Sequence, residues 1–135
     1  MADEIRPELA AYRERVERTL DEARSAARDK RHAKGYRTAR ENLIDIVDEG
    51  SFQEYGQFAV AAQRSRREYE DLQGATAADG IITGTCTINA ATVAAQRSRA
   101  AVIINDYAVL AGTQGFFHHK KLDRICELAV EQALP

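Results

Sequence analysis

Apolar positions recur along the start of the chain at the spacing of an α-helix. They form one stripe, which consists of Leu9, Tyr12, Val16, Leu20, Ala23 and Ala27. Residues three and four positions apart share one face of a helix, and such a face packs against a core. Pro7 suits the first turn of a helix, and Gly35 suits its end. The pattern predicts one amphipathic helix from Pro7 to about Lys34.

A second helix is predicted from its own start signal, the segment Thr38-Ala39-Arg40-Glu41. A threonine at the N-cap with a glutamate three residues later makes a capping box, in which each side chain bonds to the other residue's backbone N–H. The apolar residues that follow are Leu43, Ile44, Ile46 and Val47. We expect residues 48–50, Asp-Glu-Gly, to close this helix and residues 51–52 to begin an extended segment.

The sequence from residue 53 to 78 is polar and shows no clear period. Residues 58–72 fit a polar helix or an irregular arm, and both alternatives stay open. The segment Val60–Arg66 recurs identically as Val93–Arg99. Because the flanking residues differ and a repeat architecture needs several similar units, we interpret this repeat as chance.

From Ala78 onward the pattern changes to that of strands. Residues 80–88 are rich in β-branched residues and predict one strand; residues 100–104 predict a second, and residues 107–110 a third after a turn at 105–106. A helix over residues 117–133 follows, with an inner face made of Leu122, Ile125, Ala129 and Ala133.

These elements predict an α/β (α+β) fold in three parts: an N-terminal helical segment over 1–52, a polar connecting arm over 53–78 and a ββα unit over 79–135. A helix that follows a strand and a turn needs a further strand to return to. We therefore expect a chain cut short at Pro135, the opening section of a larger α/β enzyme. In that case Leu122, Ile125 and Ala129 would be partly exposed.

Composition narrows the class of protein only slightly. The 135 residues are 44% hydrophobic and 30% charged, with a net charge of −2, which is typical of a globular domain. No apolar run approaches the ~20 residues that span a bilayer, and the N-terminal sequence has no apolar signal-peptide core. Cys86 and Cys126 fall outside any paired pattern, which suggests reduced thiols. We expect a cytoplasmic protein without membrane contact.

The usual catalytic side-chain sets are missing from the sequence, so no catalytic residue is assigned. The serines, at positions 25, 51, 65 and 98, lie in no nucleophile elbow, and no phosphate-binding loop pattern occurs. His118, His119 and Cys126 match no standard zinc spacing. We assign no metal site.

Two segments could bind an anion. One is the basic run of Arg28, Lys30, Arg31, Lys34, Arg37 and Arg40, which holds a single acid, Asp29. It could hold nucleotide phosphates or nucleic acid, but cations are also favoured at a helix C-terminus, and we prefer a solvated helix end without nucleic acid.

The other segment is the turn Gly112-Thr113-Gln114-Gly115 ahead of the last helix. Backbone N–H groups at a glycine turn and a helix N-terminus can hold a phosphate or an oxyanion. His119, Lys120 and Lys121 would add positive charge. We predict an anion site whose residues are Gly112, Thr113, Gln114, Gly115, His119 and Lys121.

Five segments in order resemble the N-terminal part of the carboxyltransferase subunit or domain of biotin-dependent acyl-CoA carboxylases, such as acetyl-CoA and propionyl-CoA carboxylases. They are the TARE-type helix opening at 38–43, the D-x-GSF-x-E turn at 48–54, the DG-V-[VI]-TG strand at 78–84, the D-[YF]-T-V-L-[AG]-G-[ST]-x-G segment at 106–115, and an H…K pair formed by His119 or His118 with Lys121. The resemblance covers roughly residues 8–135. The AGTQG form is similar to the branch found in longer, fused acyl-CoA carboxylases.

The resemblance implies a crotonase-type fold, a spiral of ββα units, and an oligomer with active sites at subunit interfaces. It implies transfer of a carboxyl group from carboxybiotin to an acyl-CoA, with biotin carried on a partner protein or domain. By the same resemblance, the predicted anion site at residues 112–121 would bind the CoA. Biotin carboxylase and the biotin carrier would be partners. Residues 89–98 depart from the family pattern, and the family's glycine-rich oxyanion segments lie beyond the equivalent of Pro135, so the chain would be inactive alone. The alternative is a non-enzymatic interaction module that uses the amphipathic helix 8–34.

Overall fold

The computed structural model describes residues 5–135, and residues 1–4 of the predicted N-terminal segment lie outside the described residues. The elements in chain order are α1 (Pro7–Glu17), α2 (Ser25–His32), α3 (Ala39–Ile46), β1 (Gln53–Tyr55), α4 (Tyr69–Ala75), η1 (Ala77–Gly80), β2 (Ile81–Thr87), α5 (Ala95–Ser98), β3 (Arg99–Asn105), η2 (Leu110–Gly112) and α6 (Phe116–Glu131). The expected mixture of helices with a strand–strand–helix unit is confirmed, with β2, β3 and α6 as that unit.

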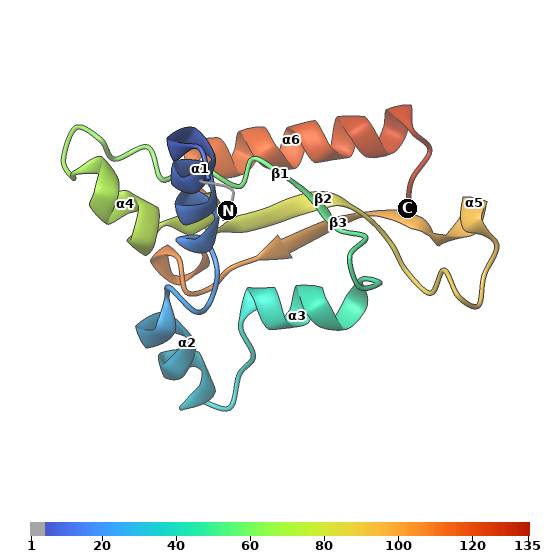
Figure 1. Ribbon diagram of the computed structural model, residues 1–135, viewed down its shortest axis with the longest axis horizontal. Helices are drawn as coiled ribbons and strands as arrows, with labels where there is room; N and C mark the ends of the chain where they lie inside the picture. The colour runs from blue at the N-terminus through green and yellow to red at the C-terminus, as the bar shows by residue number, and fades with distance from the viewer. Residues whose placement is uncertain (1–4) are drawn as a thin grey trace.

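The sheet is a small antiparallel layer between helices. Its order is β1-β2-β3, and Gly84 of β2 stands opposite Glu54 on one side and Val102 on the other. Figure 1 shows α6 along one face of the sheet and α3 across the other. Because both faces are covered, the first six residues of β2 are all buried, which explains its nearly continuous apolar and threonine-rich sequence.

The main apolar core lies between α3 and the sheet. It consists of Ala39, Leu43, Ile82, Cys86, Ala100 and Val102. The predicted capping box is confirmed: the Thr38 hydroxyl accepts from the N–H of Glu41 at 3.0 Å, and the Glu41 carboxylate accepts from the N–H of Thr38 at 2.7 Å. Two backbone donors at the start of α3 are thereby satisfied, which fixes where this helix begins.

The prediction of one helix from Pro7 to Lys34 is wrong, because the chain turns between α1 and α2. The turn is fixed by Thr19, whose buried hydroxyl donates to the carbonyl of Val16 and accepts from Nε2 of Gln57 at 2.8 Å. The apolar stripe also stays largely outside the core, since no residue of α1 is buried and Tyr12 is 55% exposed. Polar contacts to distant residues therefore override the local helical pattern here.

The region expected as a polar arm contains ordered structure. It includes β1, which is part of the sheet, and α4 at its end, while residues 56–68 are irregular. Val60, Ala61 and Leu72 pack together as a second buried cluster. The two copies of the heptapeptide differ in structure, because Val60 is buried and Val93 is 40% exposed, as expected for a chance repeat.

Asp48 closes the end of the β2–β3 hairpin. Its carboxylate accepts from the hydroxyl of Thr87 at 2.7 Å and from the N–H groups of Asn89 and Ala90 at 3.0 and 2.9 Å. These hydrogen bonds, the one from Thr87 above all, hold the pKa of Asp48 below its ordinary value. The start of segment 89–98 is therefore tied to the end of α3 by one carboxylate.

The last helix lies where it was predicted, but the third strand does not form. Residues 107–110 make a turn that leads into η2. On α6, Ile125 is 1% exposed, so the expectation that its apolar face would lie open is wrong at this position. Leu122 and Ala129 are half-buried and Ala133 is exposed. The helix covers β2 and β3, and that contact removes Ile125 from water.

Candidate functional site

The loop after β3 is held in place by Asp106. The N–H of Asp106 donates to the carbonyl of Gly80 at 2.8 Å, and its Oδ1 accepts from the N–H of Ala108 at 2.9 Å. Its Oδ2 accepts from Nη1 of Arg24 at 3.0 Å, and both side chains of this ion pair are buried. A buried ion pair keeps its geometry because separating it leaves an unpaired charge away from water. The predicted turn at 105–106 is thus a fixed corner of the molecule.

The same loop carries three successive residues with left-handed backbone. The φ angles of Leu110, Ala111 and Gly112 are 48°, 54° and 79°. Side chains with a Cβ adopt this region at a cost of about 1–3 kcal/mol each, so the surrounding contacts have to hold it. Val109, which is 1% exposed, anchors the loop, and its carbonyl accepts from the N–H of Gly112 at 3.0 Å.

A carboxylate from another turn occupies the N-terminus of α6. Oδ2 of Asp79 accepts from the backbone N–H of His118 at 2.8 Å, and a Cβ built on Gly115 would meet both carboxylate oxygens at 3.1 Å. Negative charge is favoured at this end of a helix. The positive end of the α6 dipole therefore already faces an anion that belongs to the protein.

Lys121 supports the turn that presents Asp79. Its ammonium group donates to the carbonyl of Ala78 at 2.7 Å and also to the carbonyl of Ile81. Burial lowers the pKa of Lys121 to about 8, partly offset by the nearby charge of Glu54. Its aliphatic stem lies against Gly56, where an added Cβ would come within 2.9 Å of it. The lysine is therefore built into the core between α6 and β2.

The six residues of the predicted anion site do not form one cluster. Gly112, Thr113 and Gln114 lie exposed on the loop, Gly115 is the N-cap residue of α6, and His119 is exposed on its first turn. Lys121 is buried, so its charge faces backbone carbonyls. The assignment of these residues to a CoA or anion site stays a prediction. The sequence did not single out Asp79 as a site residue. Two signals point to it: it is an aspartate directly before a buried strand, and the long helix α6 has no capping side chain of its own.

A pocket with positively charged walls lies beside this loop. We call it the cationic pocket; its lining residues are Ala27, Lys30, Arg31, Lys34, Tyr107, Ala108 and Ala111, and its volume is about 240 Å³. The first four belong to α2 and its end, and the last three to the loop after β3. The fold thus brings half of the predicted basic run against the loop that leads into Gly112.

Arg31 is fixed in the wall of the cationic pocket. Its guanidinium carbon lies 4.8 Å from the ring centre of Tyr36 and 5.4 Å from that of Tyr107, and its Nε donates to the carbonyl of Arg37. Cations above aromatic rings are held by the ring's negative face. Arg31 stays half-buried, whereas the expectation of a solvated helix end is wrong for Arg40, which is buried and bonded through both Nη atoms to Glu54.

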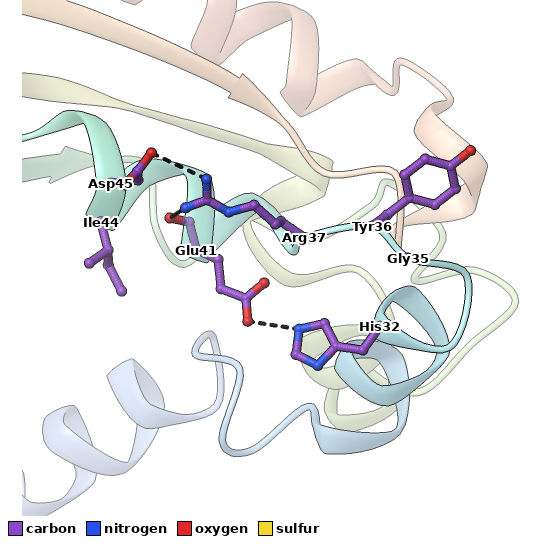
Figure 2. A pocket seen from close by; sticks show the side chains of 7 residues that line it. All are labelled: His32, Gly35, Tyr36, Arg37, Glu41, Ile44 and Asp45. Carbon is purple, nitrogen blue, oxygen red and sulfur yellow. Dashed lines mark hydrogen bonds and ion pairs between the residues drawn. The ribbon is translucent and has the colours of Figure 1, made fainter.

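A broader surface hollow of about 690 Å³ lies between the end of α2 and α3. Figure 2 shows that its charged side chains turn toward one another, with His32 facing Glu41 at 2.7 Å and Arg37 facing Asp45 at 3.2 Å. Because the polar side chains of this hollow are paired with one another, it has less to offer a charged ligand than the smaller cationic pocket.

Residues 5–135 contain no group of three or more histidine, cysteine or acidic side chains that could hold a metal ion. His118 is 1% exposed, and its Nδ1 lies 3.1 Å from the carbonyl of Asp79. No helix within these residues is long and apolar enough to cross a membrane.

Comparison with known proteins finds the chain similar to parts of biotin-dependent carboxylases. A family model described as the carboxyl transferase domain matches residues 30–135. The biotin-dependent acetyl-/propionyl-coenzyme A carboxylase beta5 subunit of Mycobacterium leprae is 32% identical over 127 residues, which cover 94% of this chain and 21% of that protein. The chain thus spans about a fifth of the length of the curated relatives that it matches.

Solved structures with the same fold include an acyl-CoA carboxylase and a transcarboxylase. The structure of a single-chain, multi-domain long-chain acyl-CoA carboxylase matches 98% of this chain and 13% of its own, with 51% identity and a TM-score of 0.94. Transcarboxylase 12S, a hexamer solved with methylmalonyl-coenzyme A and methylmalonic acid bound, matches 100% of this chain and 24% of its own, with 26% identity and a TM-score of 0.72.

Proposed function

We propose, given that this chain belongs to the carboxyl transferase domain family, that it forms the N-terminal part of the carboxyltransferase of a biotin-dependent acyl-CoA carboxylase. The reaction would move a carboxyl group from carboxybiotin to an acyl-CoA. The observation that carries the proposal is the match to the long-chain acyl-CoA carboxylase, since 51% identity over 98% of the chain goes with a TM-score of 0.94.

The alternative of an interaction module built on helix 8–34 has less support. That helix is divided into α1 and α2, and the turn between them is bonded to residues of α4 and of the loop after β3. The two short helices are therefore packed as parts of the same domain, as in the structural relatives that the chain matches over its whole length.

The contribution of this chain to acyl-CoA binding would come from the loop after β3. We propose Gly112, Thr113, Gln114 and Gly115, with His119, as a surface that faces the CoA, because these residues lie at an ordered and strained loop beside the cationic pocket. Lys121 would act indirectly, since its ammonium group holds the turn that carries Asp79. Strained loops on rigid scaffolds are frequent places for ligand contacts.

Carboxybiotin would supply the activated carboxyl group when it is bound. Holding it requires donors for the ureido oxygen, and the start of α6 is a poor candidate because Asp79 already accepts there. We therefore assign biotin binding to none of the described residues. By resemblance, those donors belong to segments that follow the equivalent of Pro135.

Partners and assembly follow from the same proposal. Biotin carboxylase and a biotin carrier, as proteins or domains, would supply the carboxyl group; in support, the Mycobacterium leprae relative is a subunit of a biotin-dependent carboxylase. A homo-oligomer is supported by the hexameric assembly of transcarboxylase 12S. A cytoplasmic location stays a prediction.

The test is a chimera of the long-chain acyl-CoA carboxylase in which the matching segment is replaced by this chain. We expect the chimera to carboxylate its biotin group and to pass the label from bicarbonate to an acyl-CoA. A matched chimera that carries Gly84→Val should keep the first step and lose the second, because the added side chain overlaps the carbonyl of Gln53. A folded first chimera that carboxylates biotin but never an acyl-CoA would refute the proposal.

A further inference from the structure

The outer face of α6 carries its charges in two blocks of opposite sign. Lys120 and Arg124 lie four positions apart, and Glu127 and Glu131 follow at the same spacing. All four side chains are exposed. Because residues three and four positions apart share one face of a helix, the four side chains form a single row along α6, which we call the charged row. Its positive half lies near the start of the helix and its negative half at the end.

This order of charges does not stabilise the helix that carries it. The helix dipole favours acidic residues in the first turn and basic residues in the last, and α6 has neither. Like charges four positions apart repel each other, and the charged row contains two such pairs, Lys120–Arg124 and Glu127–Glu131. Within residues 5–135 these four side chains form one ion pair, between Arg124 and Glu127 at 3.3 Å, and it is exposed and therefore weak. The reason for the pattern lies outside the helix.

Exposed apolar side chains border the charged row. Phe116, Phe117 and Val130 are 59%, 39% and 82% exposed. A hollow of about 200 Å³ lies beside the row, between α6 and the end of β1, with Leu128 and Tyr55 in its lining. Sites that enclose a small molecule measure about 300–1,000 Å³, so this hollow suits one bulky side chain of a protein partner. Figure 1 shows α6 as the outer layer on its side of the sheet, where a partner can reach it.

The charged row is complementary to itself when it is reversed. If two α6 helices pack face to face in opposite directions, Lys120 of one copy faces Glu131 of the other, and Arg124 faces Glu127. A two-fold axis relates the two copies, so each of these contacts occurs twice. Packing in the same direction would instead set like charges against each other. The row therefore specifies both the partner and its direction.

We propose that two copies of this chain associate through antiparallel α6 helices. The charged rows set the register of the pair, and Phe117, Leu128 and Val130 lose water at its flanks. The inference rests on the proposed function in that a homo-oligomer is part of it, and it deepens that proposal by naming an interface. None of the four charged residues belongs to the predicted anion site.

The small size of the contact sets the strength of the association. The 16 residues of α6 form a helix about 24 Å long, and one such helix pair buries less than the roughly 1,200 Å² of a stable interface. We therefore expect a monomer–dimer equilibrium with a dissociation constant of about 10–100 µM at low salt. Salt should weaken it, because the charges are exposed.

The test is sedimentation equilibrium of the 135-residue chain at low salt, over concentrations of about 10–500 µM. We expect Lys120→Glu/Arg124→Glu to weaken dimerisation at least about tenfold, and Glu127→Lys/Glu131→Lys to do the same. The chain that carries all four substitutions has the reversed row and should dimerise within about threefold of the unchanged chain. An equimolar mixture of the two double variants should also associate, because one row is then entirely negative and the other entirely positive.

The control is Arg66→Glu/Arg97→Glu, which makes the same change of charge at exposed positions outside α6. It should dimerise within about twofold of the unchanged chain. Circular dichroism of each variant confirms that the fold is kept. If charge reversal disturbs the fold, Lys120→Gln/Arg124→Gln and Glu127→Gln/Glu131→Gln repeat the comparison.

Three outcomes overturn the proposal. An unchanged chain that stays monomeric over the whole range leaves α6 to a different partner. A dimer that neither double variant weakens has its contact on another surface. A chain with all four substitutions that fails to dimerise shows that the charges do not set the register. The chimera described above reports on carboxyl transfer separately, so an active chimera with a monomeric chain rejects this interface alone, and an inactive chimera with the expected dimer rejects the proposed function alone.

Discussion

Arg24 and Asp106 are 82 positions apart in the sequence and form an ion pair with an Nη1–Oδ2 distance of 3.0 Å. Their side chains are 7% and 12% exposed, so the pair lies almost entirely away from water. It joins the turn between α1 and α2 to the corner that follows β3. The N-terminal helices are held to the rest of the protein by polar contacts of this kind, among them Gln57–Thr19 and Arg24–Gly74, because α1 itself has no buried residue.

Removing one partner of this pair should destabilise the protein strongly. We expect Asp106→Ala to lower the free energy of unfolding by about 3–5 kcal/mol, because Arg24 is left as a buried charge and the N–H of Ala108 loses its acceptor. Urea unfolding followed by circular dichroism measures the loss. The exposed pair Arg37–Asp45 is the control, since Asp45→Ala should cost at most about 1 kcal/mol. Similar losses in the two variants would contradict this account.

The carboxylate of Asp79 should be required for the start of α6. We expect Asp79→Ala to cost about 2 kcal/mol, because the buried N–H of His118 loses its acceptor and the helix loses a negative charge at its N-terminus. Asp79→Asn keeps an oxygen acceptor and should cost less. Amide hydrogen exchange at His118 reports on the change locally. Asp123→Ala, on the exposed side of α6, should leave that exchange unchanged, and a loss of protection there would point to general fraying instead.

Lys121 should give the protein a rise in stability at alkaline pH. Burial lowers its folded-state pKa from 10.5 to about 8, so between these values the unfolded chain binds more protons than the folded chain. Stability from this group therefore increases as the pH rises from about 8 to about 10.5, by up to about 3 kcal/mol, and is constant below that range.

The measurement compares the free energy of unfolding at about pH 7 and about pH 10 in three proteins. The unchanged chain should gain stability relative to Lys121→Met, in which this titration is absent. Lys120→Met removes an exposed lysine beside it and should follow the unchanged chain. Parallel pH profiles for Lys121→Met and the unchanged chain would show that the buried ammonium group does not titrate in this range.

Two glycines should respond in opposite directions to the same substitution. A Cβ at Gly84 would lie 2.2 Å from the carbonyl oxygen of Gln53 and 2.5 Å from the ring of Phe52, so Gly84→Ala should cost about 3 kcal/mol. Gly74 lies in α4 with nothing within 4 Å of an added Cβ, so Gly74→Ala should stabilise the protein by about 0.5–1 kcal/mol. Thermal unfolding of the two variants measures both changes in stability, a loss for Gly84→Ala and a gain for Gly74→Ala. A stable Gly84→Ala protein would mean that β1 does not pack on β2 in this register.

Several elements could be predicted from the sequence because their causes are local. The Thr38–Glu41 capping box spans three positions, and the structure shows both of its hydrogen bonds. The β-branched residues of β2 predict a strand, and the spacing of apolar residues in α6 predicts a helix. Where partners are distant, prediction failed: the stripe from Leu9 to Ala27 suggested one helix, but Thr19 bonds to Gln57 and Arg24 to Asp106.

In the candidate site, too, local features could be predicted from the sequence and contacts between distant residues could not. The basic run and the turn Gly112–Gly115 were both visible in the sequence, yet nothing there placed Lys30 and Lys34 across from Tyr107. Lys121 was expected to add charge at the turn, and the fold instead buries it under the carbonyls of Ala78 and Ile81. The sequence pattern does not distinguish a buried lysine from an exposed one near the start of a helix. Only the packing of the folded chain decides where the charge lies.

The sequence by itself determined the family of this chain, the capping of α3, and the order of the strand–strand–helix unit, because motifs and periodicity act over a few residues. The tertiary structure decided which charges are exposed and which are buried. Arg24, Asp79 and Lys121 look like surface residues in the sequence, but each bonds to groups more than 35 positions away. Removing a charge from water is tolerated only where such partners are already assembled, and the complete fold alone assembles them.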